Sequence, residues 1–471
     1  MDRLLNDVDL TGTRGDLAAT EVTAVAFDSR AVPPGALFCC LPGTRRDGHD
    51  YAPAAVAAGA AALLVERPLP LPVPQAVVAP GQARHAMALA ACTLHGHPAE
   101  GLSLVGVTGT NGKTTVTRLL ADLLAGAGRR AVGLGTLDGA RTTPEAPDLQ
   151  RRLGEARSAG IDTVVMEVSS HALVQARVDG FRFDVAVFTN LSHDHLDYHG
   201  TMQSYFAAKA TLFTDEHARA AVVNVGDPWG RRLAELTTLP VTAYSPVDAT
   251  DVQVSAGGTD LTWRGRRLHL PLIGAYHVAN AVAAATTAVV LGLSEEQAAA
   301  GLGTARPVPG RFEPVPGPAP YSVVVDYAHT PDGLAVALAS ARILAAGHRV
   351  VVVFGCGGDR DRDKRPAMGA AAAAGADLVV VTADNSRSEA TGAIIDDILA
   401  GVGEASAVVV EPDRRAAIAR ALAAARPGDV VLLAGKGHET TLEVGGQVTA
   451  FDDRQVAAEL LGGRPSDGGV A

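Results

Sequence analysis

The stretch from Val105 to Thr115, with the sequence VGVTGTNGKTT, decides the fold of the middle of this chain. The segment Leu102–Val107 is mostly apolar and predicts a buried strand, and Val116–Leu124 has apolar residues at helical spacing. A glycine-rich turn between a strand and a helix, followed by Lys113 and Thr114, is the context that a phosphate-binding loop requires. The glycines let backbone N–H groups approach phosphate oxygens, and the start of the helix adds positive potential.

In such a loop, Lys113 is expected to reach the β- and γ-phosphates of a nucleotide, and the Thr114 hydroxyl is expected to hold Mg²⁺. The stretch departs from the strict pattern G-x-x-x-x-G-K-[ST], because Val107 stands where the first glycine is required. An accidental turn rich in glycine and threonine is the alternative, but the flanking strand and helix both fit the motif.

The composition indicates a globular chain of several domains. Its 471 residues predict two to four domains, and 47% hydrophobic residues suffice for sizeable cores. The net charge of −11 argues against general binding to nucleic acid. None of the four cysteines lies in a C-x-x-C pair, so buried free thiols are expected rather than a zinc ribbon or a disulfide framework.

The sequence predicts neither a signal peptide nor a membrane anchor. Met1–Leu10 lacks a signal-peptide core, and the apolar runs Ala54–Val65 and Ala281–Leu293 are too short to span a bilayer. We therefore expect a cytoplasmic protein without a membrane partner. The tail Gly462–Ala471 is expected to be frayed.

Residues 1–100 are predicted to form a small N-terminal α/β domain. Polar residues Asp28, Ser29 and Arg30 follow its first strand, and a polar loop, Gly43–Asp50, follows the second. Either could hold a polar ligand, although spacing alone favours ordinary surface loops. The expected strands are Thr23–Phe27, Ala36–Leu41, Ala61–Val65 and Gln75–Val78.

Residues 101–306 repeat strand–helix units, which predicts a mostly parallel sheet flanked by helices. Glu167 follows the expected strand Ile161–Met166, and a histidine-rich turn with His195 follows Phe183–Thr189. Ligands of such sheets sit at the carboxyl ends of the strands, so both residues are expected to meet the phosphate loop at one Mg²⁺–nucleotide site. Further expected elements are the helices Met202–Phe213, which carries Lys209, and Ala275–Leu293, and strands within Val252–Leu270.

Residues 307–471 are predicted to form a second doubly wound α/β domain after the linker-like Pro307–Gly310. Four expected strands deliver polar side chains at their carboxyl ends, which describes a cleft. The strands are Ser322–Asp326, Val350–Gly355, Leu378–Thr382 and Asp429–Ala434, and the polar ends are Asp326–Asp332, Gly355–Arg365, Asp384–Arg387 and Gly435–Glu439.

Other chemistries stay open at this point. The turn His193–His199 comes close to the H-x-H-x-D-H zinc signature of metallo-β-lactamase-like hydrolases, but Tyr198 separates Asp197 from His199. A plain phosphate-loop ATPase or a switch GTPase would not need a second α/β domain. An enzyme that joins two substrates by phosphoryl transfer would use both domains.

Taken together, the motifs resemble the Mur ligase family over nearly the whole chain, and within it most closely the MurE branch of UDP-N-acetylmuramoyl-tripeptide synthetases. The family's own phosphate loop explains the glycine that is missing at Val107. The resemblance implies an N-terminal UDP-binding domain, a central ATPase domain with a parallel sheet, and a C-terminal Rossmann-like domain. The matching stretches are Gly109–Thr114, Thr142–Glu145, Glu167–Leu173, Thr189–Gly200, Ala208–Lys209, Gly310–Phe312, Asp326–Gly333, Gly355–Pro366 and Gly435–Glu439.

The resemblance implies an ATP-dependent amide ligase of peptidoglycan precursor synthesis. ATP would phosphorylate the free carboxylate of the D-glutamate in UDP-MurNAc-L-Ala-D-Glu, and the amine of a diamino acid would attack the acyl phosphate. This order makes chemical sense, because a carboxylate does not react with an amine at neutral pH until one oxygen becomes a good leaving group. The charge on the transferring phosphoryl group needs Lys113 and Mg²⁺. The implied partners are small molecules only, and a monomer is expected.

The resemblance also assigns site residues. Lys113, Glu167, His195 and Lys209 would be catalytic, and two Mg²⁺ ions would be held by Thr114, Glu167, His195 and a carbamate formed from CO₂ on Lys209. The implied ATP contacts are Gly109, Thr110, Asn111, Gly112, Lys113, Thr114, Thr115, Asn280, Arg311 and Asp326. The implied UDP-substrate contacts are Asp28, Ser29, Arg30, Thr142, Thr143, Ser169, Gln175 and Arg177. The implied amino-acid contacts are Arg360, Asp384, Asn385, Arg387, Gly435 and Glu439.

The amino acid is predicted to be meso-diaminopimelate rather than L-lysine. Arg387 stands where the diaminopimelate enzymes keep an arginine, and its guanidinium could bind the distal carboxylate through two parallel hydrogen bonds. Glu439 would pair with the distal ammonium group. With L-lysine, Arg387 would face a second cation without a partner, and sites of this kind reject an analogue by up to ~10⁴-fold.

Three departures from the family pattern keep L-lysine, another amino acid or another pathway open as alternatives. The segment between Thr136 and Thr142 is shorter than the usual hairpin. His277 replaces the usual asparagine near the adenine. Ser386 replaces the proline of the Asp-Asn-Pro-Arg signature, which would preset the turn's φ angle.

Overall fold

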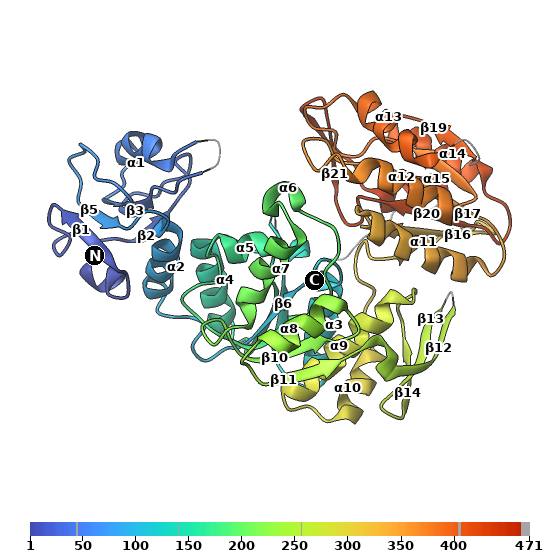
Figure 1. The fold of residues 1–471 in the computed structure, drawn as a ribbon, viewed down its shortest axis with the longest axis horizontal. Helices are drawn as coiled ribbons and strands as arrows, with labels where there is room; N and C mark the ends of the chain where they lie inside the picture. The colour runs from blue at the N-terminus through green and yellow to red at the C-terminus, as the bar shows by residue number, and fades with distance from the viewer. Residues whose placement is uncertain (44–45, 140, 256, 404–406, 463–471) are drawn as a thin grey trace.

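The computed structural model describes residues 1–43, 46–139, 141–255, 257–403 and 407–462. Three α/β units follow one another along the chain, and they lie from left to right in Figure 1. Arg45 of the predicted polar loop and nearly all of the predicted tail lie outside the described residues. No helix within the described ranges combines the length and the apolar character needed to cross a membrane.

The N-terminal unit is built on a five-stranded sheet of order β1-β5-β4-β3-β2. The four predicted strands are confirmed as β2 to β5, and they run parallel. The sequence analysis missed β1, which pairs antiparallel with β5, because Gly12 interrupts its pattern and few of its residues are buried. The elements are η1 Asp2–Leu5, β1 Leu10–Arg14, β2 Ala24–Ala26, β3 Ala36–Cys39, η2 Gly48–Tyr51, α1 Ala52–Ala57, β4 Ala62–Val65, β5 Gln75–Val78 and α2 Ala83–Leu94.

The middle unit contains a six-stranded, fully parallel sheet of order β11-β10-β9-β6-β8-β7. The strand β6 lies between β8 and β9, with Val107 opposite Glu167 and Thr108 opposite Phe188. This register brings the carboxyl ends of the three strands to one edge, as predicted. The elements are β6 Ser103–Thr108, α3 Lys113–Gly126, β7 Ala131–Leu134, η3 Thr136–Asp138, α4 Ala146–Ser158, β8 Thr163–Glu167, α5 Ser170–Val174, β9 Phe183–Phe188, α6 Leu196–His199, α7 Met202–Ala210, η4 Thr211–Phe213, β10 Ala218–Asn224, α8 Pro228–Leu236, β11 Val241–Tyr244 and η5 Pro246–Asp248.

A small antiparallel sheet and two helices complete the middle unit. The buried faces of α3 and α9 share one apolar core with residues of this small sheet, such as Leu261 and Trp263. The predicted helix over Met202–Phe213 is α7 followed by the 3₁₀ turn η4, and the other predicted helix is α9. The elements are β12 Ala249–Ser255, β13 Gly258–Trp263, β14 Arg266–Leu270, α9 Tyr276–Val290 and α10 Glu295–Leu302.

The C-terminal unit has a six-stranded sheet of order β15-β16-β20-β17-β18-β19. All strands except the short β15 run parallel, and their valine- and leucine-rich sequences are buried on both faces. The end of β20 therefore lies between the ends of β16 and β17. The elements are β15 Glu313–Pro314, β16 Ser322–Asp326, α11 Pro331–Ala345, β17 Val350–Phe354, α12 Lys364–Gly375, β18 Leu378–Val381, α13 Thr391–Val402, β19 Val408–Val410, α14 Arg414–Ala424, β20 Val430–Ala434, β21 Thr441–Val444, β22 Gln447–Ala450 and α15 Asp453–Leu460.

The segment Pro307–Gly310, between the middle and C-terminal units, is packed rather than loose. Val308 is buried, and the amide of Gly310 donates to Glu313 Oε2 at 2.6 Å. Gly310 has a φ of +66°, and a Cβ atom there would overlap the backbone of Gly437 and His438. The start of the C-terminal unit therefore packs directly against the loop that follows β20.

We predict that Gly310→Ala lowers the melting temperature by about 3–10 °C more than Gly347→Ala does, because overpacking costs about 1–3 kcal/mol. Gly347 is a matched control in the same unit, since its φ is +97° and a Cβ atom there would meet nothing within 4 Å. Scanning calorimetry of both variants measures the difference. Equal losses would mean that the contact with Gly437 and His438 carries no stability.

Candidate active site

A cavity of about 410 Å³ lies between the strand ends of the middle unit and the first strand and helix of the C-terminal unit. Most of the residues predicted to bind ATP or metal line it. Those predicted residues are Thr110, Asn111, Gly112, Lys113, Thr114, Thr115, Glu167, His195, Lys209, Asn280, Arg311 and Asp326, together with Thr142 and Ser169 from the predicted substrate contacts.

The phosphate loop is preformed by contacts with the turn after β9. Gly109 and Gly112 have φ angles of +150° and +87°, and a Cβ atom at either position would overlap a neighbouring side chain, Thr189 or Asn280. The Thr189 hydroxyl donates to the Asn111 carbonyl at 2.6 Å. Only glycine fits these two positions, so the loop's shape follows directly from its sequence.

Two lysines donate to the same carbonyl oxygen of this loop. Lys113 Nζ and Lys209 Nζ each lie 2.9 Å from the oxygen of Gly109, and Lys113 also donates to Thr110 at 2.8 Å. Lys209 is fully buried beside Tyr205, with its amine 4.7 Å from the ring centre. Burial, and then the charge of Lys113, hold the pKa of Lys209 well below its usual range. A neutral amine at this position is a nucleophile, which is the state that reacts with CO₂.

Glu167 is linked to the C-terminal unit through Thr114. Its carboxylate accepts hydrogen bonds from the Thr114 hydroxyl at 2.9 Å and from the Thr136 amide at 2.8 Å. Arg311, which begins the C-terminal unit, donates to the same Thr114 hydroxyl at 3.0 Å. A carboxylate and a hydroxyl oxygen in contact are the kind of ligands that Mg²⁺ takes in nucleotide sites.

His195 begins α6 in a left-handed conformation with a φ of +52°. Its Nε2 lies 3.4 Å from Asp194 Oδ2. Burial lowers the pKa of His195, so its imidazole is neutral and could bind a metal. Thr114, Glu167 and His195 all line the cavity, so a hydroxyl, a carboxylate and a neutral imidazole are available there to a metal ion.

His193 points away from the other two histidines of the predicted zinc-like turn, His195 and His199, which both pack against His171. His193 Nε2 lies 3.4 Å from Asp361 in the C-terminal unit, whereas His199 Nε2 lies 2.9 Å from Ser170 Oγ and its ring stacks on Tyr205. Within the parts of the chain that the structure describes, no group of three or more His, Cys, Asp or Glu side chains is arranged to hold a metal ion. This geometry does not support a zinc hydrolase.

Asp326 is held by three donors on the nucleotide side of the cavity. Its carboxylate accepts from the Tyr276 hydroxyl at 3.0 Å and from the amides of Phe312 and Ala328, both at 2.8 Å. Burial raises the pKa of Asp326. His277 is fully buried beside Tyr276, and burial lowers its pKa to about 3, so it is a neutral core residue. Sequence reasoning missed Tyr276, although it lies one residue before His277.

The predicted substrate residues fall into two places. Thr143 donates to the backbone oxygen of Glu167 at 2.9 Å, and Arg177 donates to the Thr143 carbonyl at 2.9 Å and to Gln175 at 2.7 Å. Asp28, Ser29 and Arg30 instead follow β2 in the N-terminal unit, where Arg30 binds Asp28 at 2.7 Å and lowers its pKa to about 2. These three residues do not line the 410 Å³ cavity.

Sequence reasoning missed the buried carboxylate of Glu145, which pairs with arginines of both the N-terminal and the middle unit. Glu145 pairs with Arg141 and Arg177 at 2.9 Å and with Arg84 of α2 at 3.5 Å. The charge of Arg141 also lowers the pKa of Asp28. Three guanidinium groups around one carboxylate leave an excess of positive charge beside the predicted substrate contacts. The sequence did contain a feature that could have singled out Glu145, because this residue ends the matching stretch Thr142–Glu145.

The predicted amino-acid residues assemble in the C-terminal unit, outside that cavity. Asn385 donates to Glu439 Oε2 at 2.8 Å, and Arg387 donates to the Gly358 carbonyl at 2.6 Å. Asp384 and Gly435 follow β18 and β20, with Asp384 Oδ2 3.1 Å from an ideal Cβ at Gly435. Arg360 lies exposed on the loop after β17.

The turn that holds Arg387 is supported despite the serine at position 386. Arg387 has a φ of +51°, and its amide donates to the Glu443 carbonyl at 3.2 Å. Its carbonyl accepts from the Gly446 amide at 3.1 Å, so the hairpin β21–β22 fixes the turn from outside. Ser386 is buried and accepts a hydrogen bond from Thr391 at 3.0 Å.

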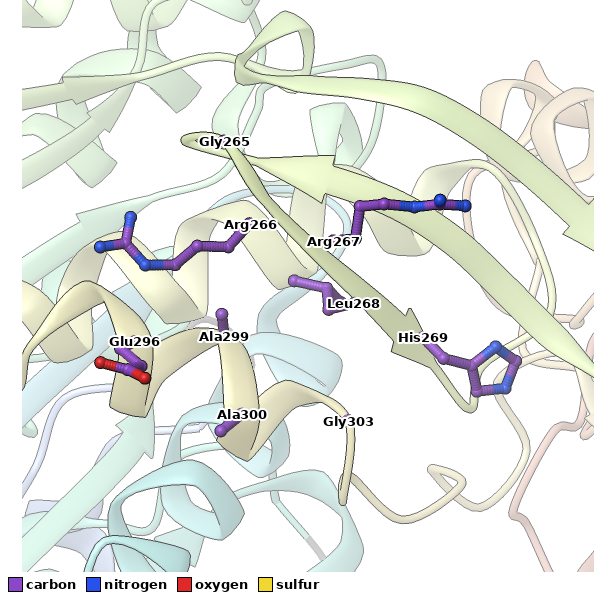
Figure 2. Close-up of a pocket in the computed structure, with 9 residues that line it drawn as sticks. All are labelled: Gly265, Arg266, Arg267, Leu268, His269, Glu296, Ala299, Ala300 and Gly303. Atoms are coloured by element: carbon purple, nitrogen blue, oxygen red, sulfur yellow. The ribbon is translucent and has the colours of Figure 1, made fainter.

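A second hollow lies on the surface between β14 and α10, far along the middle unit from the phosphate loop (Figure 2). Figure 2 shows the guanidinium groups of Arg266 and Arg267 pointing away from each other. Arg266 pairs with Glu295 at 2.7 Å, and His269 pairs with Asp260 at 2.9 Å. Two of its polar side chains, Arg266 and His269, are thus already paired, and none of the residues predicted to bind ATP or metal lines this hollow.

Three family descriptions match the chain in succession. "Mur ligase family, catalytic domain" matches residues 21–103, "Mur ligase middle domain" matches residues 107–288, and "Mur ligase, glutamate ligase domain" matches residues 310–437. The matches follow the three units of the structure.

Known proteins of the same architecture cover nearly the whole chain. The UDP-N-acetylmuramoyl-L-alanyl-D-glutamate–2,6-diaminopimelate ligase of Solibacter usitatus is 46% identical over 470 residues, which span 95% of this chain and 95% of that protein. A solved structure of a ligase with that name is 32% identical, with a TM-score of 0.66. The match covers 97% of this chain and 98% of that one. MurF from Thermotoga maritima, solved with ADP, is 19% identical, with a TM-score of 0.64. The match covers 95% of this chain and 98% of that one and shows a likeness of fold.

The buried Lys209 generates a prediction about pH and stability. Because its pKa is lowered in the folded chain, the unfolded chain binds more protons between that lowered value and about 10.4, so stability rises with pH in this window. In CO₂-free buffer, Lys209→Met should reduce the slope of the free energy of unfolding against pH by up to about 1.4 kcal/mol per pH unit. Urea unfolding between pH 7.5 and 9.5 measures it, with Gln203→Met on the exposed face of α7 as control. Equal slopes for wild type and Lys209→Met would contradict a lowered pKa.

Proposed function

The chain belongs to the Mur ligase family, and on this premise we propose that it joins meso-diaminopimelate to UDP-MurNAc-L-Ala-D-Glu in peptidoglycan precursor synthesis, with ATP as the energy source. It is an ATP-dependent amide ligase. The proposal is carried by one observation, the contact chain Arg311–Thr114–Glu167, which joins the phosphate loop to a second α/β unit. In this proposal, residues 1–100 bind the UDP end of the substrate, residues 101–306 bind ATP, and residues 307–471 bind the amino acid.

The phosphate loop and Arg311 supply positive charge where the phosphoryl group moves. The Lys113 ammonium group donates to the carbonyls of Gly109 and Thr110 inside the loop. The ATP phosphates would replace these carbonyls as its partners. Arg311 lies over Tyr327, with its guanidinium 4.6 Å from the ring centre, so the ring orients it toward Thr114. Both cations would stabilise the negative charge that develops as phosphate passes to the D-glutamate carboxylate.

We assign metal binding to Thr114, Glu167, His195 and a carbamate on Lys209. Mg²⁺ bound there would neutralise phosphate charge and orient the phosphate oxygens. The carbamate would form when the neutral Lys209 amine attacks CO₂ and releases one proton. Its negative charge would also attract the ammonium group of Lys113, which shares the Gly109 carbonyl with Lys209.

The muramoyl-dipeptide would bind along Thr142, Thr143, Ser169, Gln175 and Arg177. These residues approach Glu167 through the hydrogen bond from Thr143 to the Glu167 backbone. The uridine end would reach Asp28, Ser29 and Arg30 in the N-terminal unit. The cations around Glu145 lie between the two groups, which suits a substrate that carries a diphosphate and a free carboxylate.

The diamino acid would bind at Arg360, Asp384, Asn385, Arg387, Gly435 and Glu439. One guanidinium nitrogen of Arg387 donates to the Gly358 carbonyl. Its other nitrogens are left to pair with the distal carboxylate of the ligand. Because the hairpin β21–β22 fixes the backbone of Arg387, the serine at position 386 does not release the turn.

The reaction is tested by phosphate release and by the mass of the product. With ATP, Mg²⁺, UDP-MurNAc-dipeptide and meso-diaminopimelate, we predict stoichiometric phosphate and a new amide product. Omitting either substrate should reduce turnover by at least about 100-fold, because either the carboxylate that accepts the phosphoryl group or the amine that attacks the acyl phosphate is then missing. Rapid ATP hydrolysis that ignores both acceptors would point to a plain ATPase.

Lys209→Ala should reduce kcat by about 10²–10³-fold or more, because an anionic group that orients the reacting phosphate is lost. A short carboxylate such as acetate should restore part of the activity by filling the vacated space. Lys113→Ala serves as the control, since an added carboxylate cannot replace a cation. Activity of Lys209→Ala near the wild-type level, or rescue of both variants alike, would refute the carbamate.

Arg387→Ala should lower kcat/KM for meso-diaminopimelate by about 10²-fold or more while leaving that for L-lysine nearly unchanged, because only diaminopimelate has the distal carboxylate. The control is Arg415→Ala, whose side chain pairs with Glu459 on α15 at 2.8 Å, away from these strand ends. Equal use of both amino acids by the wild type would contradict the assignment.

A further inference from the structure

Lys436 is a buried cation inside the amino-acid residues, and no role has been given to it so far. It is fully buried in the loop after β20. Its ammonium group lies 3.0 Å from Glu439 Oε2, 3.7 Å from Asp384 Oδ1 and 3.3 Å from Asn385 Oδ1. A single cation therefore contacts three of the residues proposed to bind the amino acid.

These contacts fix the pocket before any ligand arrives. Lys436 donates to Oε2 of Glu439, and Asn385 donates to the same oxygen at 2.8 Å. The side-chain oxygen of Asn385 is also occupied, because it accepts both from Lys436 and from the Glu443 amide, the latter at 3.0 Å. Glu439 thus has its second carboxylate oxygen left for an ammonium group of the ligand.

The second consequence concerns net charge. Arg360, Arg387 and Lys436 are cations, and Asp384 and Glu439 are anions, so the pocket carries one net positive charge. meso-Diaminopimelate with its attacking amine deprotonated has two carboxylates and one ammonium, a net charge of −1. L-Lysine in the same state has one of each and is neutral. Without Lys436, the charges of the other four residues would cancel, and the pocket would suit lysine better.

We infer that Lys436 is a specificity-determining residue, whose buried ammonium group sets the pocket's charge to favour a diamino acid with two carboxylates. The inference rests on the proposed function and names the discriminating charge of that same site. Lys436 acts through Asp384, Asn385 and Glu439, so it is a positioning residue that does not touch the reacting atoms.

The test is a series of variants in which the pocket's charge changes by one unit at a time. The readout is the ratio of kcat/KM for meso-diaminopimelate to that for L-lysine. Lys436→Met lowers the charge by one and should reduce the ratio by at least about tenfold, since unit charges a few Å apart interact by several kcal/mol near a protein surface. Glu439→Gln raises the charge by one and should increase the ratio, although both amino acids lose a partner for their ammonium group.

Two further variants separate charge from structure. Lys436→Arg keeps the cation and should keep the ratio. The double variant Lys436→Met with Glu439→Gln restores the original net charge and should return the ratio to within about threefold of wild type. KM for ATP should stay unchanged throughout, because Lys436 does not line the nucleotide cavity.

The outcomes are distinct. If wild type makes no product with either amino acid, the proposed function fails. If wild type prefers diaminopimelate but Lys436→Met keeps that preference, the inference about Lys436 is overturned. Should Lys436→Met fail to fold, Glu439→Gln decides, because it retains the buried cation, and an unchanged or lower ratio in that variant overturns the inference.

Discussion

The carbonyl oxygen of Gly109 accepts hydrogen bonds from two lysine amines, and the chemistry of the site depends on this constraint. Two ammonium groups cannot share one acceptor in a buried place at low cost, so one amine has to lose its proton. Burial lowers the pKa of both amines, but it holds that of Lys209 well below its usual range, and Lys209 is almost completely buried whereas Lys113 is half-buried. The loop thus holds one cation and one neutral amine.

The same loop connects the two α/β units. Thr114, the second residue of α3, binds Glu167 of its own sheet and Arg311 of the next unit. Arg311 is followed by Phe312, whose amide binds Asp326 at the end of β16. Because Gly310 packs against the loop after β20, this short connection fixes how the C-terminal sheet faces the nucleotide. The ligase chemistry therefore depends on a few contacts around residues 310–312.

Sequence patterns predicted those parts of the structure that local rules determine. Buried parallel strands, the glycine loop and the polar strand ends are visible in hydrophobic runs and turns, so the convergence of Glu167 with the phosphate loop was predictable. The strand β1 was not predicted, because its residues are largely exposed and Gly12 interrupts their pattern. The hairpin β21–β22 was missed although the turn Gly445–Gly446 follows the alternating residues Leu442 and Val444, which is a hairpin signal. Glu145 and Lys436 were missed for another reason. Each lies in a stretch that matches the family, but its contacts include partners up to 61 residues away in sequence, which only the folded chain brings together.

The central claim is that phosphate passes from ATP to the D-glutamate carboxylate before the amide forms. The most direct test uses UDP-MurNAc-L-Ala-D-Glu with ¹⁸O in the side-chain carboxylate of the glutamate. Transfer through an acyl phosphate moves one labelled oxygen into the released phosphate, where the isotope shift in ³¹P NMR reports it. We predict one ¹⁸O per phosphate released with the amide product. Unlabelled phosphate accompanying full amide formation would contradict the account.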